Sequence, residues 1–262
     1  MPETSSSATG VIVLGPYRSG TSVTSQVLSA LGVDFGPKRY FVPASQNNPG
    51  GFYERVDINQ ANELLLESGG QSLAYPGDPR ELSKHADIHM LDGANMNWRR
   101  ANHYWGVKDP RFCATLFTWI DSGRMDRNNL RIVHVRRKLE PAVRSSMTFS
   151  SIRNFCDGTE ASVRKMLDRY AELAQWHVDE LQLPTFAFDY ERLVKEPELV
   201  VQQLADFLSV TSPTKLRRAI RIIGKGKGMF ALQLERYLIR APRRVFYFLT
   251  GRNKDGSPRA AK

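Results

Sequence analysis

The segment from Val11 to Ser22 constrains the fold more than any other part of the chain. It reads Val-Ile-Val-Leu-Gly-Pro-Tyr-Arg-Ser-Gly-Thr-Ser, an apolar run and a glycine-bounded turn that lead into the helical pattern Thr21–Leu31. A buried strand that enters a helix through a tight loop directs the free N–H groups of the helix at one point. These donors and the helix dipole favour negative charge there. The segment therefore predicts a binding site for a phosphate-like anion after the first strand.

The loop differs from the nucleotide-binding pattern G-x-x-x-x-G-K-[ST]. Gly15 and Gly20 have the spacing of that pattern, but Thr21 stands where it requires lysine, and the cation, Arg18, lies inside the loop. An ATPase or GTPase without this lysine is disfavoured. A nucleotide-dependent kinase that acts on a small molecule or sugar is kept as the alternative function.

Further along the chain, apolar runs typical of strands alternate with helical patterns. The expected strands are Val11–Leu14, Trp105–Val107, Leu130–Val135 and Thr185–Phe188. The expected helices are Thr21–Leu31, Asp57–Glu67, Pro110–Ser122, Glu140–Ser151, Glu160–Glu180 and Glu198–Leu208. This alternation predicts an α/β fold with a mostly parallel central sheet flanked by helices. In such sheets the ligand lies beyond the carboxyl ends of the strands, where the Gly15–Thr21 loop is expected.

We expect a single domain over residues 11–250, with disordered tails at 1–10 and 251–262. The segments Asp34–Gly51 and Gly69–Arg80 are rich in Gly, Pro, Asn and Ser and are expected to be long loops that shape a binding site.

The composition is that of a soluble globular protein, with 41% hydrophobic and 24% charged residues. No apolar stretch reaches the roughly 18 residues of a membrane-spanning helix. Cys113 and Cys156 form neither a disulfide framework nor a metal-ligand pattern, so we expect buried thiols, no metal and a cytoplasmic location.

The net charge of +10 is concentrated at the C-terminal end. From Lys215 to Lys262 there are fourteen Lys and Arg residues against two acids, while the remainder is close to neutral. This distribution disfavours a nucleic-acid-binding module, whose charge would lie on the body of the fold. Within it, Phe230–Leu249 is expected to pack on the core with its charges in water. The alternatives are a peripheral membrane contact and a wall of the nucleotide or of an acidic-glycan site.

A second segment, Leu130–Ser146, repeats the layout of a strand that ends in arginines and leads into a helix. Arg137 and Ser145 are eight residues apart. A guanidinium offers a rigid fork to phosphate oxygens, and a hydroxyl on the following helix supplies another donor. Arg136 ends the same strand and is the neighbouring candidate, but eight residues after it stands Arg144.

Three segments, in order, resemble the sulfotransferases that use 3′-phosphoadenosine 5′-phosphosulfate (PAPS), in particular their bacterial members. They are the Arg18-Ser-Gly-Thr-Ser22 loop, the strand and helix with Arg137 and Ser145, and Tyr190-Glu-Arg-Leu193 followed by a helix that starts at Pro197. The Arg-Lys-Gly signature that the cytosolic members carry near the C-terminus is absent.

The resemblance implies that PAPS is the sulfuryl donor and that no metal is needed. The acceptor would be a hydroxyl of a carbohydrate, a glycolipid or a small metabolite. The first loop would hold the 5′ side of the donor, Arg137 and Ser145 would clamp the 3′-phosphate, and Tyr190 would approach the adenine. The loop residues concerned are Gly15, Tyr17, Arg18, Ser19, Gly20, Thr21 and Ser22.

The resemblance also implies catalytic roles. Arg18 occupies the position of a lysine that contacts the bridging oxygen of the donor. Glu54, which follows two aromatic residues, is the first choice for the base that takes the acceptor proton, and Asp109 is the alternative. Lys108, at the end of the second strand, would stabilise charge on the transferring group.

Overall fold

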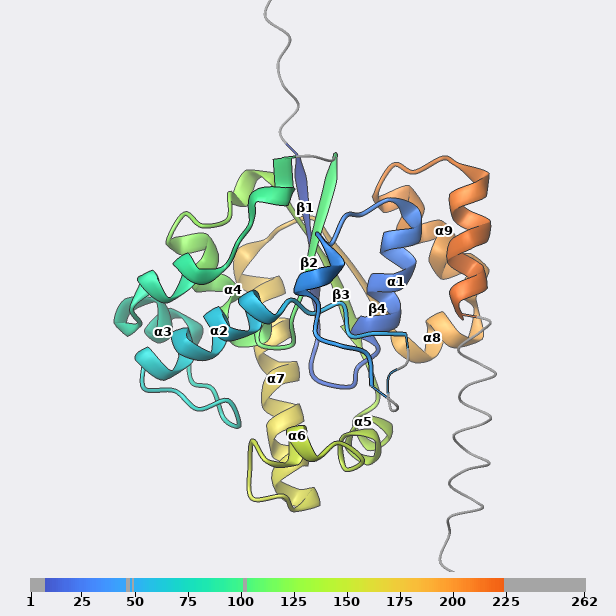
Figure 1. Cartoon of the computed structure of the whole chain (residues 1–262). Coiled ribbons are helices and arrows are strands. Elements are labelled where there is room, and N and C mark those ends of the chain that lie inside the picture. The colour runs from blue at the N-terminus through green and yellow to red at the C-terminus, as the bar shows by residue number, and fades with distance from the viewer. Residues whose placement is uncertain (1–7, 46–47, 49, 101–102, 224–262) are drawn as a thin grey trace, which may run out of the picture.

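The computed structural model describes residues 8–45, 48, 50–100 and 103–223. Its centre is a parallel sheet with the strand order β2-β1-β3-β4 (Figure 1). The strands are β1 (Thr9–Leu14), β2 (Tyr104–Lys108), β3 (Leu130–Arg136) and β4 (Thr185–Asp189). Because all four run in the same direction, their carboxyl ends share one edge of the sheet.

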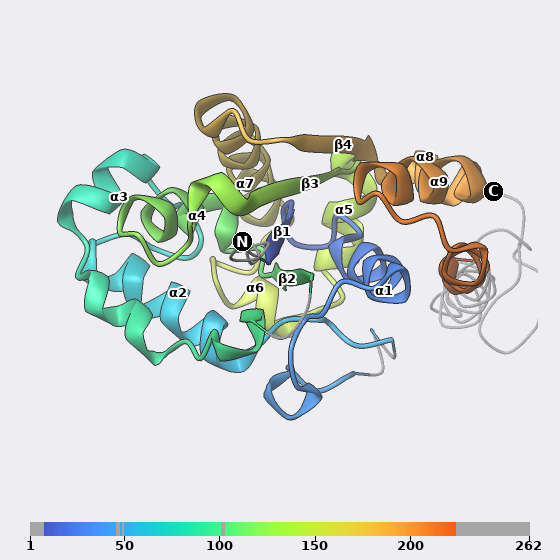
Figure 2. The same ribbon diagram turned by 90° about the horizontal axis from the view of Figure 1, so that it is seen from above.

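Helices connect the strands and cover the sheet on both faces (Figure 2). They are α1 (Thr21–Leu31), α2 (Val56–Ser68), α3 (Pro79–His85), α4 (Phe112–Asp121), α5 (Leu139–Ser146), α6 (Ser150–Arg153), α7 (Glu160–Leu181), α8 (Tyr190–Lys195) and α9 (Pro197–Phe207). Short 3-10 helices are formed by Lys38–Tyr40, Ile88–Gly93, Asn97–Arg100 and Arg127–Asn129, and residues 213–223 are also helical.

The central strands are apolar throughout because both of their faces are buried. In β1, Ile12 and Leu14 point into the core that includes α2, α4 and α7, while Val11 and Val13 point into the core that includes α1 and α9. All four side chains are at most 1% exposed. The predicted α/β fold with a parallel sheet flanked by helices is therefore confirmed.

Three local predictions differ from the structure. β1 begins at Thr9, inside the predicted N-terminal tail. The helix predicted over Glu140–Ser151 is two helices, α5 and α6, because the Thr148 hydroxyl donates to the carbonyl of Ser145 (2.7 Å) and Phe149 is extended. The predicted loop Gly69–Arg80 ends in α3, whose first N–H groups donate to the Asp78 carboxylate.

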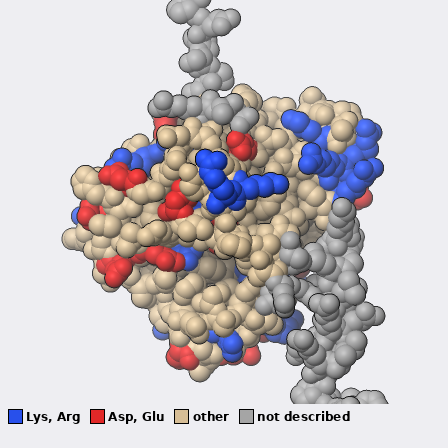
Figure 3. Space-filling model, viewed as in Figure 1, with Lys and Arg blue, Asp and Glu red and all other residues tan. Residues whose placement is uncertain are grey.

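Most of the basic C-terminal segment, including the predicted tail 251–262, lies outside the described residues, as do residues 1–7. The described part of this segment is the helical stretch 213–223. Its exposed cations gather on one side of the molecule (Figure 3): Lys215, Arg217, Arg218 and Arg221. Of the helices that the structure describes, none has the length and apolar character needed to span a bilayer.

Candidate active site

A cavity of about 340 Å³ lies over the carboxyl ends of the sheet strands. Nine of the predicted site residues line it: Tyr17, Arg18, Gly20, Thr21, Ser22, Glu54, Lys108, Arg137 and Tyr190. The other four, Gly15, Ser19, Asp109 and Ser145, are not part of its lining. The structure thus brings residues from the ends of all four strands and from the α1–α2 connection to one cavity.

The loop between β1 and α1 is shaped by left-handed backbone at Arg18 (φ 61°) and Gly20 (φ 98°). Gly20 precedes α1, and neither a capping side chain nor an acidic residue satisfies the first turn of this helix. Its N–H groups, together with the positive end of the helix dipole, can bind an anion. A Cβ atom on Gly20 would lie 2.2 Å from Cδ2 of Tyr190, so glycine is required where this ring covers the loop.

Two arginines join the loop to the end of β3. Arg137 donates from Nη1 to the main-chain carbonyl of Arg18 (2.6 Å), and Arg18 donates from Nε to the hydroxyl of Ser145 (3.0 Å). Arg137 also stacks on the ring of Tyr190, with its Cζ 4.8 Å from the ring centroid. Arg18 of the first predicted phosphate site, Arg137 and Ser145 of the second, and the predicted adenine contact Tyr190 therefore form one connected group.

This group carries positive charge that is not paired directly with a carboxylate of the described residues. Among the described residues, neither Arg18 nor Arg137 forms an ion pair with a carboxylate. Burial, and then the nearby charge of Arg137, lower the pKa of the Arg18 guanidinium to about 10, and burial lowers the pKa of Arg137. Both side chains stay charged at neutral pH, so a bound anion would stabilise the site.

Some buried polar atoms in this region also lack a hydrogen-bond partner among the described residues. Among them are the hydroxyl oxygen of Ser19, a residue with no exposed surface, and Nε of Arg137. A buried donor without a partner costs about 1–3 kcal/mol. Unpaired donors and unneutralised cations fit a ligand with phosphate groups.

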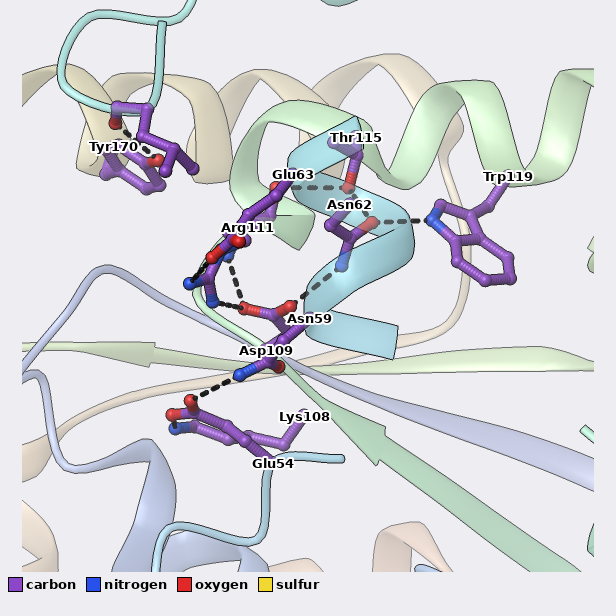
Figure 4. A network of polar contacts seen from close by, with 11 residues as sticks. Glu54, Asn59, Asn62, Glu63, Lys108, Asp109, Arg111, Thr115, Trp119 and Tyr170 are labelled. Atoms are coloured by element: carbon purple, nitrogen blue, oxygen red, sulfur yellow. Dashed lines mark hydrogen bonds and ion pairs between the residues drawn. The ribbon is translucent and has the colours of Figure 1, made fainter. Parts of the chain in front are cut away.

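Glu54 and Lys108 form an ion pair between the α1–α2 connection and the end of β2 (Figure 4). Both side chains are largely buried, with 12% and 3% exposure. Asn59 of α2 donates from Nδ2 to the second carboxylate oxygen of Glu54 (3.3 Å). The carboxylate therefore has a fixed orientation inside the cavity, next to a cation.

Asp109 follows Lys108 in the sequence but lies in a different environment from Glu54, the ion-pair partner of Lys108. It has no exposed surface, and it accepts hydrogen bonds from Nη1 of Arg111 (3.0 Å) and Nδ2 of Asn62 (2.9 Å) (Figure 4). Asn62 in turn accepts from Thr115 and Trp119 (2.8 Å each). The network fixes Asp109 between β2 and α4, outside the cavity lining.

The aromatic residues between α5 and the start of α7 were not predicted as part of the site. Phe149 and Phe155 line the cavity. The guanidinium of Arg18 lies 4.1 Å from the ring centroid of Phe149, and Phe155 packs against Tyr17 at 5.6 Å. The sequence predicts one helix over Glu140–Ser151, which contains Phe149 and ends before Phe155, and no pattern in it places these rings opposite the phosphate loop.

A model of the sulfotransferase family matches residues 10–213, a stretch that includes every residue of this cavity. Among solved structures, the chain is similar to the "Sulfotransferase Domain from the Curacin Biosynthetic Pathway", with 16% sequence identity, a TM-score of 0.45, and coverage of 80% of this chain and 76% of that chain. The comparison with curated proteins gave no match. Since the family model spans well over half of the sequence, this chain belongs to the sulfotransferase family and is an enzyme of sulfuryl transfer.

Proposed function

We propose that this sulfotransferase takes its sulfuryl group from PAPS and transfers it to a hydroxyl of a small acceptor without a negative charge. The observation that carries the proposal is the pair of half-buried arginines, Arg18 and Arg137, which contact one another and have no carboxylate partner among the described residues. A donor with phosphate groups at both ends of its ribose suits two cations that belong to two adjacent strand ends.

The residues of the cavity divide between the two ends of such a donor. The N–H groups at the start of α1 and the buried hydroxyl of Ser19 would hold the 5′-phosphate. Arg137 and Ser145 would hold the 3′-phosphate, and Tyr190, which stacks on Arg137, would contact the adenosine. Arg18, which is bonded to Ser145 and accepts from Arg137, connects the two sets.

A bound phosphosulfate supplies a sulfuryl group whose bond to the bridging oxygen breaks as the acceptor oxygen bonds to sulfur. The task of the protein is to align the reactants and to stabilise charge that grows on the leaving oxygen. Arg18 and Lys108 are the cations of the cavity that can do the latter. Glu54 is the carboxylate placed to take the proton of the acceptor hydroxyl, because Lys108 and Asn59 orient it inside the cavity.

We assign Asp109 a positioning role instead of the role of base. Both of its oxygens are used by Arg111 and Asn62, and it lies outside the cavity lining. Burial works to lower the pKa of Arg111, but the surrounding negative charges, with Asp109 first among them, raise it well above its usual value. Asp109 and Arg111 therefore form a stable buried pair that supports the end of β2.

The charges of the cavity favour an uncharged acceptor. Beyond the donor group, its cations are already paired: Lys108 with Glu54, and Arg111 with Asp109 and Glu63. No further cation of the described lining is left for an anionic sugar. The same part of the cavity has apolar walls from Tyr17, Phe155 and their neighbours, which suit a small metabolite or the apolar part of a glycolipid.

Incubation with ³⁵S-labelled PAPS tests this function. Pairs of acceptors should share one hydroxyl-bearing ring and differ only in charge, for example a methyl glucoside against a methyl glucuronide and 2-naphthol against a hydroxynaphthoate. We expect label transfer, with the neutral member of each pair preferred. Absence of transfer to every acceptor, together with tight binding of Mg-ATP, would favour the kinase alternative.

A further inference from the structure

Arg55 follows the proposed base in the sequence and is one of the most enclosed charged side chains in the described structure, with 3% exposure. It does not line the cavity. We propose that Arg55 is a positioning residue that fixes the Glu54 carboxylate opposite Lys108. The inference rests on the proposed role of Glu54. It makes the orientation of Glu54 depend on the contacts of Arg55 with two distant segments, residues 36–42 and 95–98.

The guanidinium of Arg55 is held in its own plane by hydrogen bonds. Nε and Nη2 donate to the two carboxylate oxygens of Asp57 (3.1 and 2.6 Å), and Nη2 also donates to the carbonyl of Asn95 (3.0 Å). Asp57 is bonded in addition to the N–H groups of Asn95 and Ile58 (3.0 Å each). The start of α2 is thereby tied to the segment that precedes β2.

Aromatic rings hold the guanidinium by its faces. Its Cζ lies 4.0 Å from the ring centroid of Trp98 and 4.5 Å from that of Tyr40. Gly36 completes the enclosure, since a Cβ on this residue would lie 2.7 Å from Nη1 of Arg55 and 3.0 Å from the Trp98 ring. A stacked arginine with paired hydrogen bonds cannot be replaced by lysine without loss of both features.

Main-chain contacts hold the backbone on both sides of Glu54, next to the enclosed guanidinium. Phe41 and Arg55 form an antiparallel bridge, and the N–H of Val42 donates to the carbonyl of Glu54 (2.8 Å). Tyr53, directly before Glu54, has left-handed backbone (φ 58°), which is unfavourable for a tyrosine unless its surroundings hold it. Without the Arg55 contacts this segment would lose the constraint that aims the carboxylate at Lys108.

Substitution of Arg55 by lysine tests the proposal in the full-length enzyme. Misplacement of a reacting group by about 1 Å can cost up to about 100-fold in rate, so we expect Arg55→Lys to lower kcat by about 10- to 100-fold. Its affinity for adenosine 3′,5′-bisphosphate should change less than about twofold, because Arg55 lies outside the donor group. Tyr40→Leu, which removes one stacking face, should lower kcat by a smaller factor.

Arg131→Lys is the matched control for a general loss of stability. Arg131 also stacks on an aromatic ring, that of Phe207 at 5.3 Å, and bonds to a main-chain carbonyl, but it belongs to the start of β3, at the opposite edge of the sheet from the cavity. Its substitution should leave kcat unchanged at a temperature where both variants are folded.

A double variant separates positioning from support of the fold. If Arg55 acts through Glu54, adding Arg55→Lys to Glu54→Gln should cause no further loss of the residual kcat. Equal losses in the two backgrounds, or a kcat of Arg55→Lys within about twofold of wild type, would overturn the proposal. Full activity of Glu54→Gln would instead reject the proposed base itself, so the two failures can be told apart.

Discussion

Nη1 of Arg137 donates a hydrogen bond to the main-chain carbonyl of Arg18 over 2.6 Å. This bond joins the end of β3 to the loop after β1, two strands that are neighbours in the sheet. Two anion-binding features that lie far apart in the sequence are thereby parts of one site. The following predictions test how this site and its surroundings work.

Arg137→Ala should weaken the binding of adenosine 3′,5′-bisphosphate by about 10- to 100-fold, because a hydrogen bond to a charged group contributes about 1.5–3 kcal/mol. Arg136→Ala is the matched control. The side chain of Arg136 is 51% exposed and pairs with Asp189 at the surface, so its loss should change the dissociation constant by less than about threefold. Calorimetric titration of both variants checks this. Equal effects of the two substitutions on the dissociation constant would contradict the choice of Arg137 as the arginine that binds the 3′-phosphate.

Gly20→Ala should reduce both donor affinity and thermal stability. The added Cβ would meet the Tyr190 ring at 2.2 Å, and the left-handed backbone at φ 98° adds strain of about 1–2 kcal/mol. Gly123→Ala isolates the strain, since Gly123 is also left-handed (φ 73°) but has open space around it. The difference in melting temperature between these variants measures the contact with Tyr190. A Gly20→Ala protein that binds the donor product normally would contradict the proposed packing.

Glu54→Gln and Asp109→Asn should fail in different ways. We expect Glu54→Gln to fold normally and to lose about 100-fold or more in kcat, because the base is removed. Asp109→Asn leaves the Arg111 charge buried with less compensation, so it should lower the free energy of unfolding by about 3–5 kcal/mol. Steady-state kinetics with urea unfolding separate the two. A stable Asp109→Asn enzyme with greatly reduced kcat would return Asp109 to the role of base.

The sheet and the phosphate loop could be predicted because local patterns encode them. The apolar run Val11–Leu14 and the turn between Gly15 and Gly20 favour a strand followed by a loop through their local sequence alone, without contacts from distant segments. The strand order could not be read in this way, because neighbours in a parallel sheet are chosen by contacts between distant segments. The proximity of Arg18 to Ser145 is such a contact.

The surroundings of Glu54 and Asp109 show a second limit of sequence reasoning. Both are carboxylates close to predicted strand ends or loops, and the sequence kept them as alternatives for one role. Their difference comes from partners on α2: Asn59 reaches Glu54 in the cavity, whereas Asn62 holds Asp109 behind it. Two side chains of one helix thus decide which carboxylate faces the cavity, and no pattern in the sequence marks them.

Acid should destabilise the protein through its buried histidines. Burial lowers the pKa of His177 to about 4, and its ring bridges two elements: Nε2 accepts from the Phe117 N–H (3.0 Å) and Nδ1 donates to the Leu173 carbonyl (2.8 Å). The unfolded chain takes up this proton near pH 6.5, so the stabilisation is complete above that pH and is lost as the pH falls towards 4. The loss amounts to roughly 3 kcal/mol.

Urea unfolding at pH 7 and pH 5 checks this prediction. The free energy of unfolding of His177→Gln should depend less on pH over this range than that of the wild type. His89→Gln is the control, because the His89 side chain is 78% exposed. Burial also lowers the pKa of His134 to about 4, so some dependence should remain in His177→Gln. Identical pH profiles for His177→Gln and wild type would contradict the assignment of a neutral, buried imidazole.

Calorimetric titration of the wild-type enzyme with adenosine 3′,5′-bisphosphate tests the central claim most directly, since this nucleotide presents a phosphate to each strand end at once. We predict one binding site per chain, with an affinity that exceeds those of the 5′-monophosphate and the 3′-monophosphate by at least about tenfold each. No measurable binding, or equal affinity for the bisphosphate and either monophosphate, would contradict a donor site built jointly from the ends of β1 and β3.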